Sequence, residues 1–283
     1  MKCGIFLLLQ SPGMRPSQET YDHALEQGVL ADQLGFDYIV AAEHHFSSYG
    51  FLPCPQLLIP ILAERTQHIR FSTAVVVLPL RNPIQLAEEI AMLDILTKGR
   101  VEVGFGTGYQ QYEFDRFGVK LEENRAMFEE ALELITKLLS TENVTHQGRY
   151  WRLPETTILP RPITKPHPPF WRATSSVSTM AWSLAHGLKV ITGGTASSMD
   201  RIINNWHLFQ EAVELAQVPW PQEFIIQRGV YVSESEEDAK SMLPHAVWHT
   251  RTARGLSANA LPVDAGRAMT ELTAQGARSH LSG

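Results

Sequence analysis

The stretch that decides the fold is Tyr38-Ile-Val-Ala-Ala-Glu-His-His-Phe46. Its first half is short, apolar and partly β-branched, which is typical of a strand buried on both faces. Its second half changes at once to the ionisable side chains of Glu43, His44 and His45. In a parallel α/β barrel, the carboxyl ends of the strands form the face that carries active sites. The stretch therefore predicts three polar side chains at a barrel mouth, although a histidine pair can also bind only its own loop.

Strand-like and helix-like segments alternate along most of the chain. Seven short apolar runs predict strands, at 4–9, 38–42, 71–78, 100–105, 170–173, 190–192 and 224–232. Apolar residues at helical spacing lie between these runs, most clearly at 122–140. Such alternation predicts a parallel sheet. For a chain of 283 residues, the order favours one domain over 1–283 that folds as a (β/α)8 TIM-type barrel.

Two regions interrupt the alternation of predicted strands and helices, and the pattern is weak near the end of the chain. Residues 107–120 and 144–169 are predicted as loop or insertion regions, with a hairpin at 144–153. Near the end of the chain, residues 267–276 fit a last helix, but 279–283 make a poor strand. The eighth βα unit is therefore expected to be short or incomplete.

Composition excludes several classes of function. The formal net charge is −6 and the basic residues form no cluster, so no nucleic acid is expected as a partner. No apolar run reaches the roughly 18 residues of a membrane helix, so no membrane association is expected. Cys3 and Cys54 lack metal-ligand spacing, and His44 and His45 are adjacent, so no metal site is predicted. Two such cysteines favour reduced thiols in a cytoplasmic protein.

Two turns rich in hydroxyl groups or glycine follow the fifth and sixth predicted strands. Thr174, Ser175, Ser176 and Ser178 belong to the first turn, and Gly193 and Gly194 begin the second. Hydroxyls and free N–H groups at a helix start bind phosphate, but they can equally cap the helix. Because both turns lie on one face of the predicted barrel, where phosphate is often bound, a phosphate site is favoured.

A third turn, Gly104-Phe-Gly-Thr-Gly108, ends the fourth predicted strand. Its glycines let the backbone approach a flat ligand closely, although it can also be only a tight turn. The turn matches the dinucleotide-binding fingerprint in part only, and no helix is predicted after it. Tyr109 and Phe114 follow and could cover an aromatic ring. A Gly-x-Ser-x-Gly elbow is absent from the sequence, so hydrolase chemistry has no candidate nucleophile.

An ordered set of short motifs resembles one protein family. The motifs are Glu43-His-His-Phe46, Leu78-Pro-Leu-Arg-Asn-Pro83, Gly106-x-Gly-Tyr109, Glu113-Phe-x-x-Phe-Gly-Val119 and Arg228-x-x-Tyr-Val232. In this order they look like the bacterial-luciferase-like flavin-dependent monooxygenases, over roughly residues 2–240. The resemblance implies a (β/α)8 barrel, usually a homodimer, that uses reduced FMN supplied by a separate flavin reductase. Some branches of the family bind a deazaflavin instead.

The resemblance also implies roles for individual residues. His44 would be the catalytic histidine beside the flavin, with Glu43 and His45 orienting it. The implied cofactor-binding residues are Glu43, Val75, Val76, Val77, Gly106, Thr107, Gly108, Thr174, Ser175, Ser176, Ser178, Gly193 and Gly194. The implied substrate-side residues are His45, Tyr109, Glu113 and Phe114. A non-proline cis peptide bond is expected near the end of the third strand.

The implied reaction inserts one oxygen atom from O2 into a small organic substrate. Reduced FMN and O2 would form a flavin C4a-hydroperoxide, while the protein orients the flavin and excludes water. The short chain and its weak final segment leave two alternatives open. One is a deazaflavin-dependent oxidoreductase on the same barrel, and the other is a non-catalytic flavin-binding relative.

Overall fold

Strands and helices alternate as predicted in a computed structural model of the chain, which describes residues 1–11, 15–194 and 197–258. The strands are β1 (Gly4–Leu7), β2 (Tyr38–Ala41), β3 (Arg70–Thr73), β4 (Val76–Val77), β5 (Val101–Gly106), β6 (Val144–Gln147), β7 (Arg152–Thr156), β8 (Phe170–Ala173), β9 (Lys189–Gly193) and β10 (Phe224–Gln227). The α-helices are α1 (Ser17–Gln33), α2 (Pro55–Arg65), α3 (Pro83–Leu96), α4 (Gln111–Phe117), α5 (Asn124–Ser140), α6 (Val177–Ala185), α7 (Met199–Ala216), α8 (Glu236–Ser241) and α9 (Leu243–Ala258). Two short 3-10 helices are η1 (Leu78–Leu80) and η2 (Leu121–Glu123).

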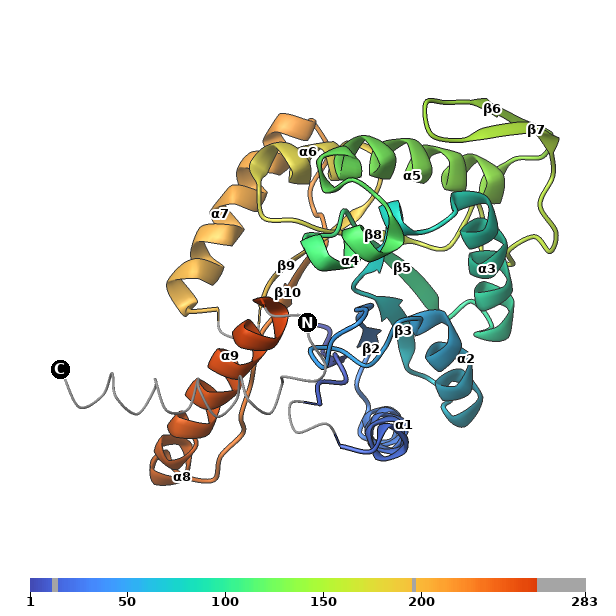
Figure 1. The fold of residues 1–283 in the computed structure, drawn as a ribbon. Helices are drawn as coiled ribbons and strands as arrows, with labels where there is room; N and C mark the ends of the chain where they lie inside the picture. Colours follow the sequence, from blue (N-terminus) through green and yellow to red (C-terminus); the bar gives the residue numbers. More distant parts are fainter. Residues whose placement is uncertain (12–14, 195–196, 259–283) are drawn as a thin grey trace.

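The parallel strands form the wall of a nearly closed TIM-type barrel (Figure 1). They lie side by side in the order β1-β2-β3-β5-β8-β9-β10, and β4 pairs with β5. Helices pack around the outside of this wall, as in (β/α)8 barrels. Within the described ranges, β1 and β10 are the two edges of the wall. The predicted last helix and weak eighth strand, at 267–276 and 279–283, lie outside the described residues.

The alternation of side chains along β2 explains how the strand is buried on both faces. Tyr38 and Val40 point into the barrel and pack with Trp171 of β8 and Ile191 of β9. Ile39, between them, packs into the larger core beneath the helices. Side chains along a strand point to opposite faces in turn, so an unbroken apolar run is required here.

The structure corrects several predicted boundaries. The third strand, predicted at 71–78, divides into β3 and β4, and the peptide bond between Ala74 and Val75 is cis. The seventh strand, predicted at 224–232, ends at Gln227, and Val230 and Val232 beyond it are exposed. These two side chains are not packed in a core, so the apolar run alone predicted a strand that was too long. The hairpin predicted at 144–153 is confirmed as the antiparallel pair β6 and β7.

The predicted loop 107–120 contains a helix, α4, so the prediction of no helix after the glycine turn was wrong. The helix has only seven residues, too few to show a clear helical repeat. It ends at Gly118, whose φ of 68° is a left-handed conformation that glycine adopts without strain. Because α4 lies just after β5, it brings new side chains to the carboxyl ends of the strands.

A buried network of charges lies inside the barrel at the amino ends of the strands. The Glu102 carboxylate accepts hydrogen bonds from the Tyr38 hydroxyl at 2.8 Å and from Lys189 Nζ at 2.8 Å. The indole N–H of Trp171 also donates to it. Glu102 is 3% exposed, and buried charges of this kind are tolerated only when they are paired.

Candidate functional site

A cavity of about 410 Å³ opens at the carboxyl ends of the strands. The predicted site residues that line it are Glu43, His44, Val75, Val77, Gly106, Thr107, Gly108, Tyr109, Glu113, Gly193 and Gly194. Most of them follow or end β2, β3, β4, β5 and β9, and Glu113 lies on α4, so segments far apart in the sequence meet at one mouth. This is the arrangement that a parallel barrel produces for its active-site face.

The other predicted site residues lie near this cavity without lining it. Thr174 and Ser175 line an adjoining cavity of about 230 Å³. Ser176 and Ser178 lie at the start of α6, where Ser176 is the residue before the helix. The remaining three are buried behind the cavity wall: His45, Val76 and Phe114.

His44 is held by the carboxylate of a residue on another element, the short helix α4. Its Nδ1 lies 3.3 Å from Oε1 of Glu113, on α4. The same oxygen accepts a hydrogen bond from the backbone N–H of His45 at 2.9 Å. The His44 side chain is 12% exposed and that of Glu113 is 2% exposed. Since a carboxylate only accepts, Nδ1 is the donor in this pair, and Nε2 takes no part in it.

Glu43 and His45 were expected to orient His44, and the structure shows no direct hydrogen bond from either side chain to the His44 ring within the described residues. Instead they bind each other, with Nε2 of His45 2.9 Å from Oε1 of Glu43. Adjacent side chains project in different directions, so the pair turns away from His44. The second carboxylate oxygen of Glu43, Oε2, is buried and has no hydrogen-bond partner within the described residues. Burial lowers the pKa of the nearby Arg81, but the carboxylates of Glu43 and Glu89 raise it overall.

Sequence reasoning missed two residues that belong to this region. Tyr49 stacks edge-on against the His44 ring, with the ring centroids 4.6 Å apart. Burial, with a further contribution from Tyr109, raises the pKa of Tyr49. Arg201, in the first turn of α7, lines the adjoining cavity together with Thr174 and Ser175. A cation just after the glycine turn was a visible signal for Arg201, whereas Tyr49 lies in a loop without a motif.

Glycines shape the floor of the main cavity. A Cβ atom on Gly106 would lie 2.5 Å from Val75 Cγ2, and one on Gly108 would lie 2.7 Å from Val77 Cγ1. Gly108 also has a φ of 75°, which a residue with a side chain rarely adopts. The cis bond between Ala74 and Val75 lies at the same wall, where a non-proline cis peptide was expected.

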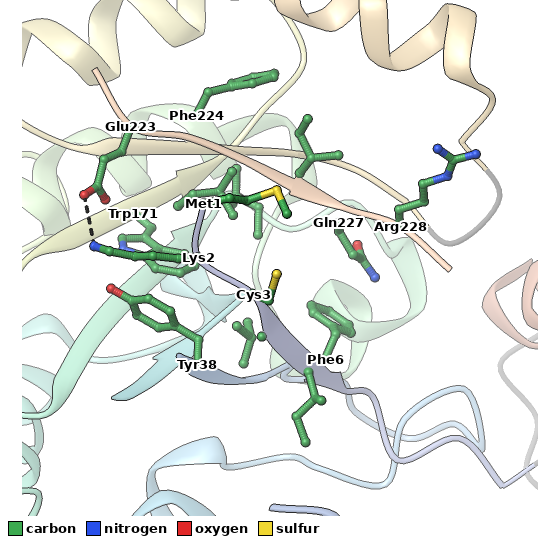
Figure 2. Close-up of a pocket in the computed structure, with 16 residues that line it drawn as sticks. Met1, Lys2, Cys3, Phe6, Tyr38, Trp171, Glu223, Phe224, Gln227 and Arg228 are labelled. Atoms are coloured by element: carbon green, nitrogen blue, oxygen red, sulfur yellow. Dashed lines mark ion pairs between the residues drawn. The ribbon is translucent and has the colours of Figure 1, made fainter. Parts of the chain in front are cut away.

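A second opening lies between the edge strands β1 and β10 (Figure 2). It has a volume of about 500 Å³ and reaches the interior aromatic rings of Tyr38 and Trp171. Lys2 and Glu223 form an ion pair of 3.5 Å across it. Phe6 lines this opening as well as the main cavity, so the two spaces are neighbours within the barrel.

Metal-binding clusters and membrane-spanning helices are both absent from the part of the chain that the structure describes. No group of three or more His, Cys, Asp or Glu side chains there is arranged to hold a metal ion. Nor does any described helix have the length and apolar character needed to cross a bilayer.

Comparison with known proteins identifies similar sequences. A family model described as luciferase-like monooxygenase matches residues 1–281. The oxygenase component of flavin-dependent trigonelline monooxygenase from Acinetobacter baylyi is 30% identical over 243 residues, 85% of this chain and 67% of that protein. "Uncharacterized protein y4vJ" of Sinorhizobium fredii is 43% identical over 188 residues, 66% of this chain and 54% of that protein. The chain thus spans about half to two thirds of these curated relatives.

A solved structure shares the fold over nearly the whole chain. Monooxygenase RslO1 from Streptomyces bottropensis superposes with a TM-score of 0.82 at 28% identity. The superposition covers 95% of this chain and 82% of RslO1.

Proposed function

The chain belongs to the luciferase-like monooxygenase family, and from that membership we propose that it is an oxygenase dependent on reduced FMN. The proposed reaction inserts one oxygen atom from O2 into a small organic substrate through a flavin C4a-hydroperoxide. One observation carries the proposal: His44 is paired with the buried carboxylate of Glu113 beside a glycine-lined cavity. The relative named as a flavin-dependent oxygenase component supports it.

The residues around the main cavity fit a flavin ring. Its volume of about 410 Å³ falls within the range of roughly 300–1,000 Å³ that ligand pockets usually have. Gly106 and Gly108 keep the floor free of side chains. The unpartnered Oε2 of Glu43 is a buried acceptor that a ring N–H can satisfy.

Bound reduced FMN would supply the activation of O2, and the chain would supply orientation, exclusion of water and a proton. Glu113 holds the His44 ring through Nδ1, so Nε2 is the nitrogen that can hold or accept a proton toward the cavity. The low exposure of both side chains limits the access of bulk water to this pair. Tyr49 and Tyr109 flank the His44 ring and restrict its rotation.

The start of α6 is the proposed site for the phosphate group of the cofactor. Ser176 Oγ donates a hydrogen bond to Thr179 Oγ1 at 2.8 Å, so two hydroxyl groups lie together there. Free N–H groups in the first turn of a helix favour a bound anion. Thr174 and Ser175, on the turn after β8, line the smaller cavity that adjoins the main one.

We further propose a separate flavin reductase and a second copy of the chain as partners, in the cytoplasm. The description of the Acinetobacter relative as an oxygenase component supports the reductase. For the homodimer, α2 and α3 contact each other and expose a set of apolar side chains: Leu57, Ile61, Met92, Ile95 and Leu96. An exposed apolar patch of this kind favours an interface. Two free cysteines agree with a reducing compartment.

The proposal is tested by titrating the protein with FMN, with anaerobically reduced FMN and with a deazaflavin coenzyme. Preferential binding of reduced FMN, followed by transfer of ¹⁸O from ¹⁸O2 into a member of a substrate panel, is the expected result. Tight binding of the deazaflavin alone would instead select a hydride-transferring enzyme. Flavin binding without oxygen transfer to aldehydes, ketones or aromatic compounds would select a non-catalytic relative.

A further inference from the structure

Cys54 is a partly buried free cysteine at the start of α2, between Pro53 and Pro55. It is the residue before the first turn of this helix, which has 11 residues. Its thiol donates a weak hydrogen bond to Gln56, with Sγ and Oε1 3.5 Å apart. The guanidinium of Arg81 also donates a hydrogen bond to the Cys54 sulfur. A helix start and a neighbouring cation both favour the thiolate, which is the nucleophilic form of cysteine.

Arg81 can bind this sulfur and a carboxylate at the same time. Its Nη2 lies 3.0 Å from Oε2 of Glu89, on α3, and the Arg81 side chain is 20% exposed. A guanidinium carries five N–H groups in a planar fork and keeps its charge in proteins, so one carboxylate does not use all of its donors. Glu43 also acts on the Arg81 charge, and Tyr21 lies within electrostatic range of Cys54. Arg81 is therefore a permanent cation beside the thiol.

Gln56 supplies a buried donor that has no acceptor. Its Nε2 lacks a hydrogen-bond partner within the described residues, and Gln56 is 9% exposed. This nitrogen belongs to the same amide group whose oxygen accepts from Cys54, so it lies close to the sulfur. A half-turn of the amide exchanges the two atoms and places Nε2 against Sγ. Because buried donors in native folds normally have a partner, Nε2 calls for an acceptor at the position of Cys54.

We propose that Cys54 is an oxidation site at which hydrogen peroxide converts the thiol to a sulfenic acid. The sulfur attacks one peroxide oxygen, so an S–O bond forms as the O–O bond breaks. The sulfur loses two electrons, and the leaving hydroxide takes up the proton that the thiol has lost and becomes water. The new oxygen would accept hydrogen bonds from Arg81 and from Nε2 of Gln56. The inference goes beyond the proposed function and does not depend on it, since the peroxide comes from solution.

Cys3 is the matched reference within the same chain. It is free and exposed, whereas Cys54 is partly buried. Cys3 precedes a strand, β1, and not the start of a helix. If exposure alone set the rate of oxidation, Cys3 would react faster. The surroundings of Cys54 predict the opposite order, so the two rates decide between environment and exposure.

The wild type is treated with hydrogen peroxide at neutral pH, and samples are taken over time. Each sample is quenched with catalase and unfolded in urea that contains dimedone, which traps sulfenic acids whatever their burial in the fold. Mass spectrometry of the two cysteine peptides then gives both rates. We expect Cys54 to be oxidised at least about tenfold faster than Cys3. In protein that is unfolded before the peroxide is added, the ratio is expected to fall to about one.

Variants of Arg81 test the cause of the selectivity. Arg81→Met is expected to slow oxidation of Cys54 by about tenfold without changing Cys3, and Arg81→Lys to retain part of the rate. Arg65→Met is the matched control, because Arg65 is exposed in the last turn of the same helix. It is expected to leave both rates unchanged. Wild-type oxidation of Cys54 in a folded Arg81→Met variant would overturn the part assigned to Arg81.

The comparison of folded with unfolded wild type needs no variant, so it decides the inference even if Arg81→Met does not fold. Oxidation of Cys3 at a rate equal to or above that of Cys54 in the folded protein would overturn the proposal. A ratio that is the same in urea would overturn it too, because the fold would then contribute nothing. Neither result bears on flavin binding, so the proposed function stands or fails separately.

Discussion

Nδ1 of His44 lies 3.3 Å from Oε1 of Glu113, although 69 positions separate the two residues in the chain. His44 follows β2, and Glu113 lies on α4. The hydrogen bond from the His45 backbone N–H to the same oxygen fixes the carboxylate as well. The carboxylate therefore fixes the orientation of the imidazole through Nδ1, and the second ring nitrogen, Nε2, takes no part in this pair.

Replacement of Glu113 by glutamine tests this orientation. The glutamine side chain would be neutral and could present its amide N–H to Nδ1, so the ring would no longer be held as the Nδ1–H tautomer. We expect Glu113→Gln to lower kcat by at least about tenfold, with FMN affinity nearly unchanged. Asp115→Asn is the matched control, because Asp115 lies on the same helix but is exposed. Equal kcat values in the two variants would contradict the role of Glu113.

Replacement of His44 by alanine and replacement of His45 by alanine are expected to have different effects, the first on turnover and the second on stability. His44→Ala should lower turnover by about 10²-fold, the usual scale for a lost acid or base, while flavin affinity and stability remain. His45→Ala should instead lower the free energy of unfolding by about 1–3 kcal/mol, since it leaves buried Glu43 without its hydrogen bond. Steady-state kinetics and urea unfolding measure the two effects. Full turnover in His44→Ala would remove the histidine from the mechanism.

The stability of the barrel is expected to depend on pH through Glu102. Burial alone would raise the pKa of Glu102, but the hydrogen bond and charge of Lys189, with the donors Trp171 and Tyr38, hold it below its ordinary value. A lowered pKa in the folded state stabilises the fold above the unfolded value of about 4.3. That contribution is lost as the pH falls through the folded value.

Glu102→Gln should therefore lower the free energy of unfolding at neutral pH by about 3 kcal/mol, the scale of a broken buried ion pair. The difference from the wild type should narrow as the pH falls below about 4. Urea unfolding of both proteins over this pH range measures the difference in their free energies of unfolding. A difference that is independent of pH would show that the carboxylate charge does not contribute.

The exposed apolar surface of α2 and α3 predicts an effect on assembly. Ile61→Glu, on α2, should convert a dimer into a monomer, because it places a charge in the proposed interface. Leu159→Glu is the control, since Leu159 is also exposed but lies in the link before β8. Light scattering measures the mass against the chain mass of 31.7 kDa. A monomeric wild type would exclude this interface.

The barrel strands were predictable because burial on both faces requires an unbroken apolar run. The run from Tyr38 to Ala42 and the change to Glu43 marked both a strand and the end of it that faces the main cavity. The pairing of His44 with Glu113 was not predictable, because it depends on α4, a helix too short for its repeat to be recognised. The alternative pairing of Glu43 with His45 depends on side-chain directions, which adjacency in the sequence does not fix.

Arg172 illustrates a second limit of the sequence. A single arginine within the predicted strand 170–173 carries no local signal, because strand residues alternate between two faces. Only the folded chain shows that this side chain lies against the rings of Phe128, on α5, and Trp182, on α6. By contrast, the hydroxyls of Thr174 to Ser178 were visible, because their types are those that bind phosphate at helix starts.

Oxidation of reduced FMN by O2 in the presence of the protein tests the central claim most directly. Reduced FMN is mixed anaerobically with excess protein, then with oxygenated buffer, and the absorbance spectrum is followed by stopped flow. We expect an oxygenated flavin that persists longer than in buffer alone. Oxidation at the rate seen in buffer, with no binding of reduced FMN, would contradict it.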